Sequence, residues 1–505
     1  MSFTIAFRVD ATSQIGTGHF MRCLTLADAL QLHGAQISFI SRGLPDHLQA
    51  MLTARDIGFV PLSSTGAEYP LGDLAHSNWL GLSQARDAED SVYALAGQKW
   101  DWLVVDHYAL DSRWESAMRN TTRKIMVIDD LADRKHDCDV LLDQNYYQDM
   151  QTRYDGVVPE HCRILLGPRY ALLRREFRGM RQLVRPRTGP VKRILVFFGG
   201  VDAENHTKQV IDALFEIDIH GIYVDVVIGA QHPYLEQIKA SCIRLGYGCH
   251  VQTARMAELA AQADLAIGAG GSAIWERCCL GLPSLVFCTA ENQRQQLTDA
   301  AREGLLYSPE TKSGLKQAVQ KHLIALIENS LLRESLSGKG MKLVDGLGTE
   351  RVISRLGKSD IDIRLVNADD SQSLFQWRNH PSIREVSRDK SVIEWEKHQS
   401  WFEAVLADPQ RFLLIGQREQ TPLGIVRFDK QNEAAEISIY VVPGQAEIGV
   451  GQRLLSSAEL WLATNHPEVR TVRAHVLGTN LRSQTMFIGA GYELELMTYS
   501  KKLQQ

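Results

Sequence analysis

Short apolar runs alternate with helix-like stretches along the first 350 residues of the chain. Unbroken apolar strands separated by helices are typical of a parallel sheet that is covered on both faces. The pattern therefore predicts a Rossmann-like α/β lobe over residues 1–185. Its buried strands are expected at residues 3–9, 37–40, 103–105, 125–128 and 140–142.

A basic, proline-containing stretch at residues 185–190 interrupts this alternation, which then begins again. A second Rossmann-like lobe is predicted over residues 190–356, with strands at residues 194–198, 224–228, 265–267 and 285–287. Two α/β lobes joined by a linker favour a bilobal enzyme that binds its ligand between the lobes.

The pattern changes again near residue 357, and the remainder has the length of one small domain. We expect an α+β domain over residues 361–505. Its order is a strand, helices, three strands, a glycine-containing loop, a helix, a strand, a helix and a final strand. The predicted strands cover residues 361–366, 412–415, 423–428, 436–442 and 472–476, and the last helix covers residues 481–488.

Composition narrows the classes of protein that fit this pattern. A chain of 505 residues is too long for one ordinary core, so two or three domains are expected. Its 44% hydrophobic and 23% charged residues exclude a mainly disordered protein. The 55 Lys and Arg against 60 Asp and Glu leave a net charge of -5, which gives no support for broad nucleic-acid binding.

Signals for targeting and for metal binding are not found in the sequence. No apolar run is long enough to span a bilayer, and Arg8 introduces a charge too early for a signal peptide. The eight cysteines contain no Cys-x-x-Cys pair, which argues against a zinc cluster or a redox motif. A cytoplasmic enzyme with free thiols and no metal is the simplest interpretation.

Polar groups follow three predicted strands of the first lobe. They are Asp106, then Asp129 and Asp130, then residues 143–145. Ligands of open α/β sheets gather at the carboxyl ends of the strands, so these positions are candidates for a cleft. For Asp129 and Asp130 the alternative is that they cap a following helix.

The first candidate site is the glycine turn after the first strand. Ile15, Gly16 and Gly18 lead into His19, and apolar residues at helical spacing follow. Glycines allow close backbone approach, and free N–H groups at a helix start attract phosphate. An imidazole titrates near neutral pH and can accept a proton from water. The alternative is a simple turn with His19 as an exposed cap.

The second lobe carries two similar turns. Gly199 and Gly200 follow one strand, and Gly271 and Ser272 follow another. Consecutive glycines before a helix suit a diphosphate. Glu276 lies one helical turn beyond Ser272, where a carboxylate could accept hydrogen bonds from both ribose hydroxyls. The alternative is close helix–strand packing, with Glu276 as a solvated acid.

Taken together, these motifs resemble the UDP-sugar hydrolase family of pseudaminic acid biosynthesis over nearly all of residues 1–350. That family cleaves UDP-2,4-diacetamido-2,4,6-trideoxy-β-L-altropyranose and is related to GT-B glycosyltransferases of the MurG type. The matching positions are Arg8, Asp10, residues 14–19, Arg22, and residues 106–108, 129–130, 170–177, 199–202 and 291–293.

The resemblance implies a two-lobed GT-B fold, metal-independent chemistry and UDP in the second lobe. His19 matches the catalytic histidine, which would deprotonate the water that attacks the anomeric carbon with inversion. Asp10, Asp106 and Tyr108 are expected to orient His19 or the sugar. The alternative for Tyr108 is a packed aromatic ring with a satisfied hydroxyl. One departure is Trp275, where some relatives are expected to carry Asn. The expected substrate contacts are Ile15, Gly16, Gly18, Arg22, Asp106, Gly199, Gly200, Gly271, Ser272, Glu276 and Asn292.

Residues 361–505 resemble the GNAT-type acetyltransferases. The motifs that carry this resemblance are the strand at residues 436–442, the glycine loop at residues 448–451 and Asn480 with Ser483. In that fold a splayed strand pairs with pantetheine, and the loop surrounds the pyrophosphate of coenzyme A. The resemblance implies acetyl-CoA as cosubstrate, held by Val441, Val442, Ile448, Gly449, Val450, Gly451, Asn480 and Ser483.

Two positions depart from the GNAT pattern. Ala446 stands where a basic or amide residue is usual, and Phe487 replaces the frequent tyrosine general acid. Tyr492, Tyr440 or a water is left to protonate the thiolate. Glu436 is a candidate base that acts through water on the attacking amine, and its alternative is an outward strand charge. A domain that binds the coenzyme without catalysis is a further alternative.

Trp377 and Arg378 open the expected acceptor side of this domain. A similar Trp-Arg-Asn segment occurs in the acetyltransferase that acts immediately before the hydrolase, on the 4-amino group of a UDP-linked amino sugar. Trp377 would stack on the nucleotide or sugar, and Arg378 would pair with phosphate. The alternative places Trp377 in the core and Arg378 on a solvated helix.

The sequence therefore predicts a bifunctional enzyme. It would acetylate UDP-4-amino-4,6-dideoxy-β-L-AltNAc and then hydrolyse the diacetamido product to free sugar and UDP. The alternatives are a GT-B glycosyltransferase with an accessory acetyltransferase, a non-catalytic nucleotide-sugar sensor and, for the last domain, a protein N-acetyltransferase. Sugar stereochemistry and oligomeric state stay open at this point.

Overall fold

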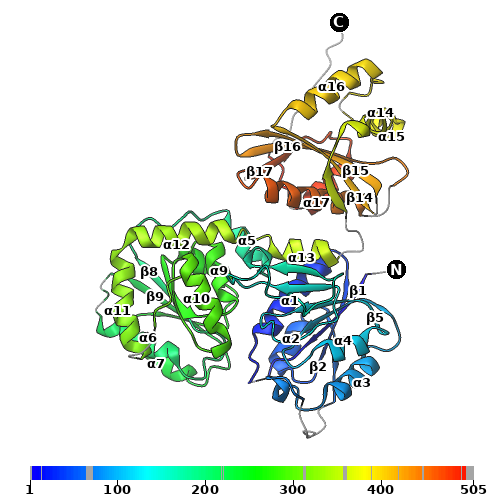
Figure 1. Cartoon of the computed structure of the whole chain (residues 1–505). Coiled ribbons are helices and arrows are strands. Elements are labelled where there is room, and N and C mark those ends of the chain that lie inside the picture. Colours follow the sequence, from blue (N-terminus) through cyan, green and yellow to red (C-terminus); the bar gives the residue numbers. More distant parts are fainter. Residues whose placement is uncertain are drawn as a thin grey trace. The chain divides into compact units, whose positions relative to one another are not determined.

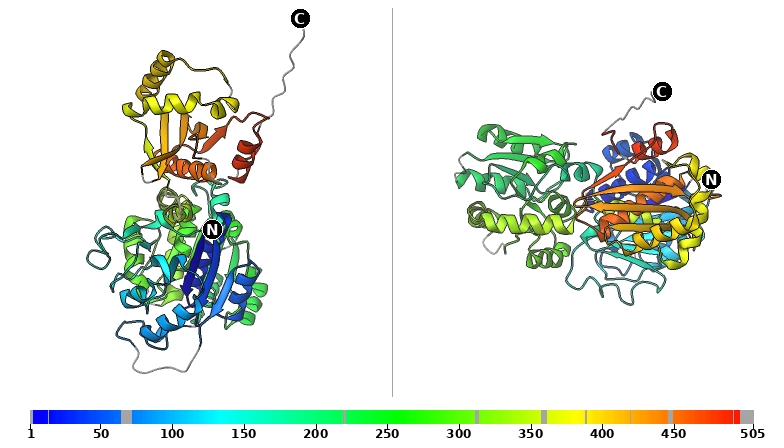
Figure 2. Two further views of the ribbon diagram at one scale, coloured as in Figure 1. Left: turned by 90° about the vertical axis from the view of Figure 1, so that its right-hand side faces the viewer. Right: turned by 90° about the horizontal axis from the view of Figure 1, so that it is seen from above.

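The chain forms two compact units, Met1–Ile353 and Ser354–Gln505, whose elements are shown in Figures 1 and 2. The computed structural model describes residues 3–12, 14–63, 72–217, 219, 221–310, 314–356, 361–387, 389–418, 420–445, 449–490 and 492–495. The first unit contains two parallel sheets, which define its first and second lobes, and the second unit contains one mixed sheet.

The first lobe is built on a seven-stranded parallel sheet in the order β3-β2-β1-β4-β5-β6-β7. This order begins as the Rossmann order does, with the switch point between β1 and β4, where ligands of such sheets bind. All six residues of β1 are buried, as the apolar run predicts. The strands are β1 Thr4–Val9, β2 Gln36–Ser41, β3 Gly58–Pro61, β4 Trp100–Asp106, β5 Thr122–Ile128, β6 Val140–Asp143 and β7 Arg163–Leu166.

Helices connect the parallel strands of the first lobe, because a parallel pair needs a crossover between its strands. Their apolar faces bury a core that includes Leu103, Trp114 and Ile125. These helices are α1 Gly18–Leu32, α2 Asp46–Thr53, α3 Gln84–Ala94 and α4 Ser112–Met118, with short 3-10 turns at η1 Ser77–Trp79 and η2 Pro168–Tyr170. The next helix, α5 Arg175–Arg181, follows the last strand of the first sheet and packs on α8 and α9 of the second lobe.

The second lobe is a five-stranded parallel sheet in the order β10-β9-β8-β11-β12, and Figure 1 shows helices on both of its faces. The strands are β8 Arg193–Phe197, β9 Tyr223–Ile228, β10 Gly248–Val251, β11 Leu265–Ala269 and β12 Ser284–Phe287. The helices are α6 His206–Glu216, α7 Leu235–Leu245, α8 Met256–Gln262, α9 Ala273–Cys279, α10 Arg294–Glu303, α11 Leu315–Glu328 and α12 Ser330–Leu343, with η3 at Glu291–Gln293. The following helix, α13 Gly348–Leu356, lies over the first lobe in Figure 1.

The second unit has a five-stranded sheet in the order β13-β14-β15-β16-β17, antiparallel except for the last pair. One core lies between the sheet and α17, and another lies on the opposite face under α14 and α16. The elements are β13 Asp362–Leu365, η4 Ala368–Asp370, α14 Ser371–Asn379, α15 Pro381–Glu385, α16 Trp395–Ala407, β14 Arg411–Arg418, β15 Thr421–Gln431, β16 Ala434–Val441, α17 Val450–Asn465, β17 Thr471–Ala474 and α18 Leu481–Gly489.

The sheets confirm the prediction of two Rossmann-like lobes followed by an α+β domain. The sequence pattern missed β3, β7 and β10, each of which is an edge strand. These strands are mostly half-buried or exposed, so they lack the unbroken apolar run by which the central strands were recognised. The final strand expected after α18 lies partly outside the described residues, and residues 492–495 form no strand.

A buried ion pair stabilises the first lobe and generates a stability prediction. Arg8 and Asp87 meet at 2.9 Å with both side chains fully buried, and the indole N–H of Trp114 also donates to Asp87. Removal of the carboxylate in Asp87→Ala leaves a buried guanidinium with less compensation, so we expect a loss of about 3 to 5 kcal/mol. Calorimetry of the intact chain would show an earlier transition for the first unit.

The matched control is Glu89→Ala, which removes a carboxylate of the same helix that forms an exposed ion pair with Arg86. Exposed pairs contribute about 0 to 1 kcal/mol, so this variant should unfold close to the wild type. Equal shifts for the two variants would contradict the assigned role of the buried pair.

Candidate active sites

The first candidate site lies at the start of α1, directly beyond the central strand β1. Gly16 has a φ of +77°, a conformation that turns the chain into the helix and that favours glycine. A Cβ at Gly18 would meet no atom within 4 Å, so the protein's own packing does not require this glycine. Thr17 occupies the N-cap position without a side-chain hydrogen bond. The turn therefore offers backbone that is open to a ligand, and His19 follows at the second helical position.

His19 is held by a carboxylate from the neighbouring strand. Its Nδ1 lies 2.5 Å from Oδ1 of Asp106, the last residue of β4. Arg22, one turn along α1, donates to both oxygens of Asp106 at 2.6 and 2.7 Å. Burial opposes ionisation of Asp106, but Arg22 and then His19 outweigh it and hold the pKa of this carboxyl below its usual range.

These contacts decide where the proton of the His19 ring lies. An ionised Asp106 can only accept, so Nδ1 must carry the hydrogen. The Arg22 nitrogen that lies 3.2 Å from Nδ1 is itself a donor and cannot replace the carboxylate as acceptor. The lone pair of a neutral His19 is consequently on Nε2. This is the tautomer that a general base supported by a carboxylate requires.

Aromatic rings form a wall beside His19. Tyr108 meets the imidazole edge-on with 4.7 Å between ring centroids, and Trp79 stacks on Tyr108 at 5.3 Å. His76 lies 4.8 Å from Trp79, also by ring centroids. The sequence pattern indicates Tyr108 but not His76 and Trp79, because the short turn η1 and its N-cap residue His76 belong to neither the strand nor the helix pattern.

The hydroxyl of Tyr108 donates to Asp130, which also accepts a hydrogen bond from Arg22 at 3.2 Å. Burial and the nearby Asp130 charge raise the pKa of Tyr108, so the phenol stays neutral. Asp130 thus belongs to the His19 cluster. The suggestion that Asp129 or Asp130 caps a helix is wrong, because residues 129–139 contain no helix; Asp129 instead accepts from the backbone N–H of Ala132 at 2.9 Å.

Asp10 is placed differently from the expectation that it orients His19. Its Oδ1 accepts from Arg8 at 2.6 Å, from Ser41 at 2.8 Å and from the backbone N–H of Arg42 at 2.7 Å. Its Oδ2 lies 3.1 Å from Nε2 of His107. These partners connect β1 to the end of β2. Asp10 is thus placed to hold the ends of β1 and β2 together rather than to contact His19.

One of the two glycine turns of the second lobe faces the first site. A Cβ on Gly200 would lie 3.7 Å from Oγ1 of Thr17, which places the Gly199–Gly200 turn against the turn that precedes α1. Gly199 and Gly271 have φ values of +100° and +85°. The structure thus brings the turn of the first lobe and one turn of the second together.

The residues predicted to contact the ligand around the Gly271 turn differ in their exposure to solvent. Glu276 lies in α9 and accepts from Arg174 at 3.2 Å, while burial raises the pKa of its carboxyl against the effect of that arginine. Ser272 and Asn292 are exposed. The residue that touches the turn is Gln293, whose Oε1 would meet a Cβ at Gly270 at 2.7 Å. Sequence analysis selected its neighbour.

Arg277 is a buried cation beneath the same turn, and sequence analysis did not find it. It is 5% exposed and donates to the carbonyl of Ala269 at 2.8 Å. Among the residues that the structure describes, no carboxylate forms an ion pair with it, and its Nε has no hydrogen-bond partner. Burial lowers its pKa to about 10, so the guanidinium remains charged at neutral pH.

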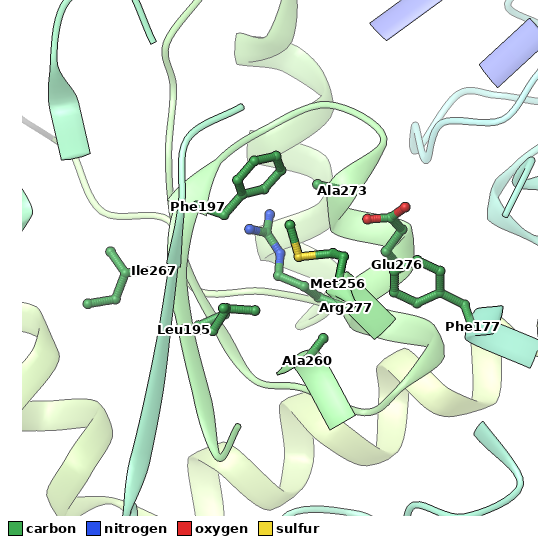
Figure 3. A pocket seen from close by; sticks show the side chains of 10 residues that line it. Phe177, Leu195, Phe197, Met256, Ala260, Ile267, Ala273, Glu276 and Arg277 are labelled. Carbon is green, nitrogen blue, oxygen red and sulfur yellow. The ribbon is translucent and has the colours of Figure 1, made fainter. Parts of the chain in front are cut away.

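A small pocket adjoins this cation, with about 290 Å³ of empty space that includes open solvent. Figure 3 shows the Arg277 side chain beside Phe197 and Met256, while the carboxylate of Glu276 points away from it. The adjacent side chains of Glu276 and Arg277 in α9 therefore point in different directions. Arg277 faces the sheet and the carbonyl end of β11, and Glu276 faces Arg174.

The second unit contains the splayed strands that the sequence predicted. β16 and β17 pair in parallel only between residues 434–437 and 471–474. Beyond Ile437, β16 continues to Val441 in its pairing with β15, and no strand of the described part of the chain pairs with its other edge there. An extended ligand can add to such an edge through backbone hydrogen bonds.

The glycine loop leads directly from this edge into α17. Gly449 is the N-cap residue, with a φ of +82°, and a Cβ on Gly451 would meet Sδ of Met486 at 3.1 Å. Val442 and Val450 are buried, whereas Ile448 lies outside the described residues. Asn480 caps α18 by accepting from the backbone N–H of Ser483 at 3.2 Å. That cap explains Asn480 and Ser483 locally and fixes the direction of the amide.

The acceptor-side residues gather on the sheet face opposite α17. Trp377 and Tyr440 pack against the apolar core beneath α14 and α16. Arg378 donates to the backbone carbonyl of Asp389 at 3.2 Å, and its Nη1 is buried without a hydrogen-bond partner among the described residues. The partly buried ring of Trp377 thus packs against the core, as the alternative expected, and its stacking on a nucleotide or sugar stays a prediction.

The candidate groups for proton transfer in the second unit differ in their exposure to solvent. Glu436 is exposed on β16, directly opposite Asp429 of β15 and 3.8 Å from His475. The hydroxyl of Tyr492 donates to Glu459 at 2.6 Å, and burial raises its pKa. Phe487 is buried and packs against Tyr492. The exposed carboxylate of Glu436 is thus better placed than the partly buried hydroxyl of Tyr492 to exchange protons with water, and Phe487 has no titratable group.

Two global properties concern metals and membranes. Over the described ranges, no group of three or more His, Cys, Asp or Glu side chains is arranged to hold a metal ion. Within the same ranges, no helix combines the length and the apolar character needed to cross a membrane.

Comparison with known proteins assigns the two parts of the chain to different relatives. Residues 360–493 match the family model described as an acetyltransferase (GNAT) domain. The chain contains a GNAT domain. This domain is also similar to the acetyltransferase PseH of Campylobacter jejuni, with 27% identity over 124 residues that cover 24% of the chain and 76% of the relative.

The first unit has a separate relative in the same organism. A UDP-2,4-diacetamido-2,4,6-trideoxy-β-L-altropyranose hydrolase of Campylobacter jejuni is 26% identical over 306 residues, which cover 59% of the chain and 97% of the relative. An uncharacterized protein of Methanocaldococcus jannaschii, MJ1062, is 22% identical over 510 residues, or 97% of the chain and 96% of the relative. The chain thus joins a hydrolase homologue to a GNAT domain.

The His19–Asp106 contact generates a prediction about the ring's tautomer. In the wild type we expect the hydrogen on Nδ1, because the ionised carboxylate can only accept. In Asp106→Asn the amide can donate to Nδ1, so the tautomer with the hydrogen on Nε2 should become populated. Nitrogen-15 NMR of histidine-labelled protein distinguishes the two tautomers, and His19→Gln assigns the signal. An unchanged Nδ1–H signal in Asp106→Asn would refute the assigned contact.

Proposed function

We propose that this protein is a bifunctional enzyme of nucleotide-sugar metabolism, in the class of pseudaminic acid biosynthesis. The second unit transfers acetyl from acetyl-CoA to the 4-amino group of UDP-4-amino-4,6-dideoxy-β-L-AltNAc. The first unit hydrolyses UDP-2,4-diacetamido-2,4,6-trideoxy-β-L-altropyranose to free sugar and UDP. The observation that carries this proposal is the His19–Asp106 pair beside open glycine turns, in a chain related to such a hydrolase.

Hydrolysis follows from the tautomer of His19. Nε2 accepts a proton from water while the water oxygen forms a bond to the anomeric carbon. The bond between that carbon and the diphosphate oxygen breaks, its electron pair leaves with UDP, and attack from the opposite face inverts the configuration. Asp106 stabilises the imidazolium that results, and Arg22 keeps Asp106 ionised and in place.

The second lobe supplies the complement to the leaving group. The turns at Gly199–Gly200 and Gly271 present backbone to a diphosphate, and the buried charge of Arg277 raises the positive potential beneath the latter turn. Glu276 is assigned to the ribose hydroxyls, with Arg174 holding its carboxylate. The aromatic wall of His76, Trp79 and Tyr108 is assigned to the sugar.

Acetyl transfer is assigned to the open edge of β16. Pantetheine adds to that edge, the loop at Gly449–Gly451 receives the pyrophosphate, and Trp377 with Arg378 borders the UDP-sugar. Glu436 removes a proton from the amine through water, because the amine must be neutral to attack the thioester. The amine nitrogen forms a bond to the acetyl carbon, the carbon–sulfur bond of the thioester breaks, and coenzyme A leaves as a thiolate, which is then protonated.

The order of the two reactions is acetylation before hydrolysis, since the hydrolase relative is named for a diacetamido sugar. Fusion of the two units raises the local concentration of the shared intermediate. The eight free cysteines fit a cytoplasmic location, where thiols stay reduced.

Replacement of the proposed base tests the hydrolase. His19→Gln should lower kcat for UDP release by about 10²- to 10⁴-fold, the range of one general base. In water enriched in oxygen-18, the wild type should place solvent oxygen on the anomeric hydroxyl of the sugar, which mass spectrometry detects. The matched control is His33→Gln at the exposed end of the same helix, which should leave the rate unchanged.

The alternatives to hydrolysis have distinct outcomes in this assay. Transfer of the sugar to another acceptor, without solvent oxygen on the sugar, would identify a glycosyltransferase. Binding of the UDP-sugar without turnover in the wild type would identify a sensor. Full activity in His19→Gln would remove the histidine from the mechanism.

A second assay tests the acetyltransferase through Glu436→Gln, an exposed and nearly isosteric change. We expect kcat for acetylation of the UDP-4-amino sugar to fall by about 10²-fold, with little change in KM for acetyl-CoA. Chromatography of free coenzyme A and of the acetylated sugar measures this rate. Glu433→Gln, on the turn before the same strand, is the control and should behave as the wild type.

If Glu436→Gln keeps the wild-type rate, Glu436 is an outward strand charge and another group deprotonates the amine. Preferential acetylation of peptides over the UDP-4-amino sugar would instead indicate a protein N-acetyltransferase.

A further inference from the structure

Asn145 joins the two lobes of the first unit through one buried amide. It follows β6 in the first lobe and is 5% exposed. Its Oδ1 accepts from the indole N–H of Trp275 at 3.0 Å and from Nε2 of Gln296 at 2.9 Å, both in the second lobe. Its Nδ2 donates to Asp130 at 3.0 Å in its own lobe. Because an indole only donates and a carboxylate only accepts, these partners fix the direction of the amide.

On the side of the first lobe, the contacts continue to the proposed base. Asp130 accepts from Arg22 at 3.2 Å on the same oxygen that meets Asn145. Arg22 grips both oxygens of Asp106, and Asp106 holds Nδ1 of His19. Each link is a hydrogen bond between buried or nearly buried groups. A shift of Asp130 is therefore transmitted to the group that orients the imidazole.

On the side of the second lobe, both donors come from helices beside the Gly271 turn. Trp275 belongs to α9, which begins at Ala273 directly after that turn, and it precedes Glu276. Gln296 belongs to α10, which follows Gln293, the residue that touches Gly270. The tryptophan that departs from the expected family pattern thus serves as a donor across the lobes.

We propose that Asn145 is a positioning residue that couples the nucleotide turn of the second lobe to the orientation of His19. This inference rests on the proposed hydrolase function. Asn145 touches neither water nor sugar in this role. When a nucleotide is bound to the second lobe, Trp275 and Gln296 hold the amide of Asn145, and this amide holds Asp130. Arg22 and Asp106 then keep the His19 ring in the tautomer and direction that the reaction requires.

The decisive variant is Asn145→Asp, which keeps the shape of the side chain. Asp130 and Asp143 are the carboxylates in contact with this position. When the new carboxyl is protonated, it can donate to Asp130 and accept from Trp275 and Gln296, as the amide does. When it is ionised, it repels Asp130. We expect the ratio of mutant to wild-type kcat for UDP release to fall by about 10- to 100-fold as the pH rises from 5 to 8.

A second variant and a matched control separate coupling from simple adhesion of the lobes. Asn145→Ala should lower kcat by about 10- to 100-fold at all pH values, because three side-chain hydrogen bonds of about two- to fivefold each are lost, with a smaller change in KM. Tyr146→Phe removes the adjacent cross-lobe hydrogen bond to Glu303, at 3.0 Å, which has no link to Asp130. It should retain the wild-type rate and pH profile.

A readout without turnover keeps this inference distinct from the proposed function. The nitrogen-15 signal of His19 should lose part of its Nδ1–H character in Asn145→Asp at pH 8 and should stay unchanged in Tyr146→Phe. If the wild type releases no UDP, the hydrolase proposal fails and this signal alone decides the coupling. Equal rate losses in Asn145→Ala and Tyr146→Phe, or an Asn145→Asp variant with the wild-type profile and signal, would overturn the role of Asn145.

Discussion

The carboxylate of Asp106 is the group on which the first site depends. A buried negative charge is unfavourable by itself, and Arg22 compensates it with two hydrogen bonds from the first turns of α1. Only an ionised Asp106 can fix the hydrogen of His19 on Nδ1. The parallel pairing of β1 with β4 sets Val9 opposite Asp106 and so brings the start of α1 to this carboxylate. The tautomer and the direction of the His19 ring thus rest on one ion pair.

Several acidic residues near the carboxyl end of the first sheet have different partners and different roles. Asp10 and Asp87 compensate the buried Arg8 and support the strand ends, while Asp130 connects Arg22 and Tyr108 to Asn145. The environment of each carboxylate, rather than its residue type, decides this division. In the second lobe the principle applies to a cation: Arg277 is buried with no ion pair to a carboxylate among the described residues, and it donates to the carbonyl of Ala269 beneath the Gly271 turn.

The candidate sites of the two units are built on different backbone features. The first unit uses glycine turns at the carboxyl ends of parallel strands, and the second uses the open edge left where β16 and β17 stop pairing. Backbone N–H groups in features of these two kinds attract phosphate-bearing ligands.

The sequence by itself determined the three sheets, the central buried strands and the motifs around His19, Asp106, Gly271 and Gly449, because these features reside in local periodicity and short-range spacing. Edge strands such as β3 escaped it, since they are not buried on both faces. Only the tertiary structure decided that Asp106 rather than Asp10 meets His19, that Gln293 rather than Asn292 touches the Gly270 turn, and that Asn145 meets Trp275 across 130 residues. Such pairings depend on how strands and helices are laid side by side, which no local pattern in the chain records.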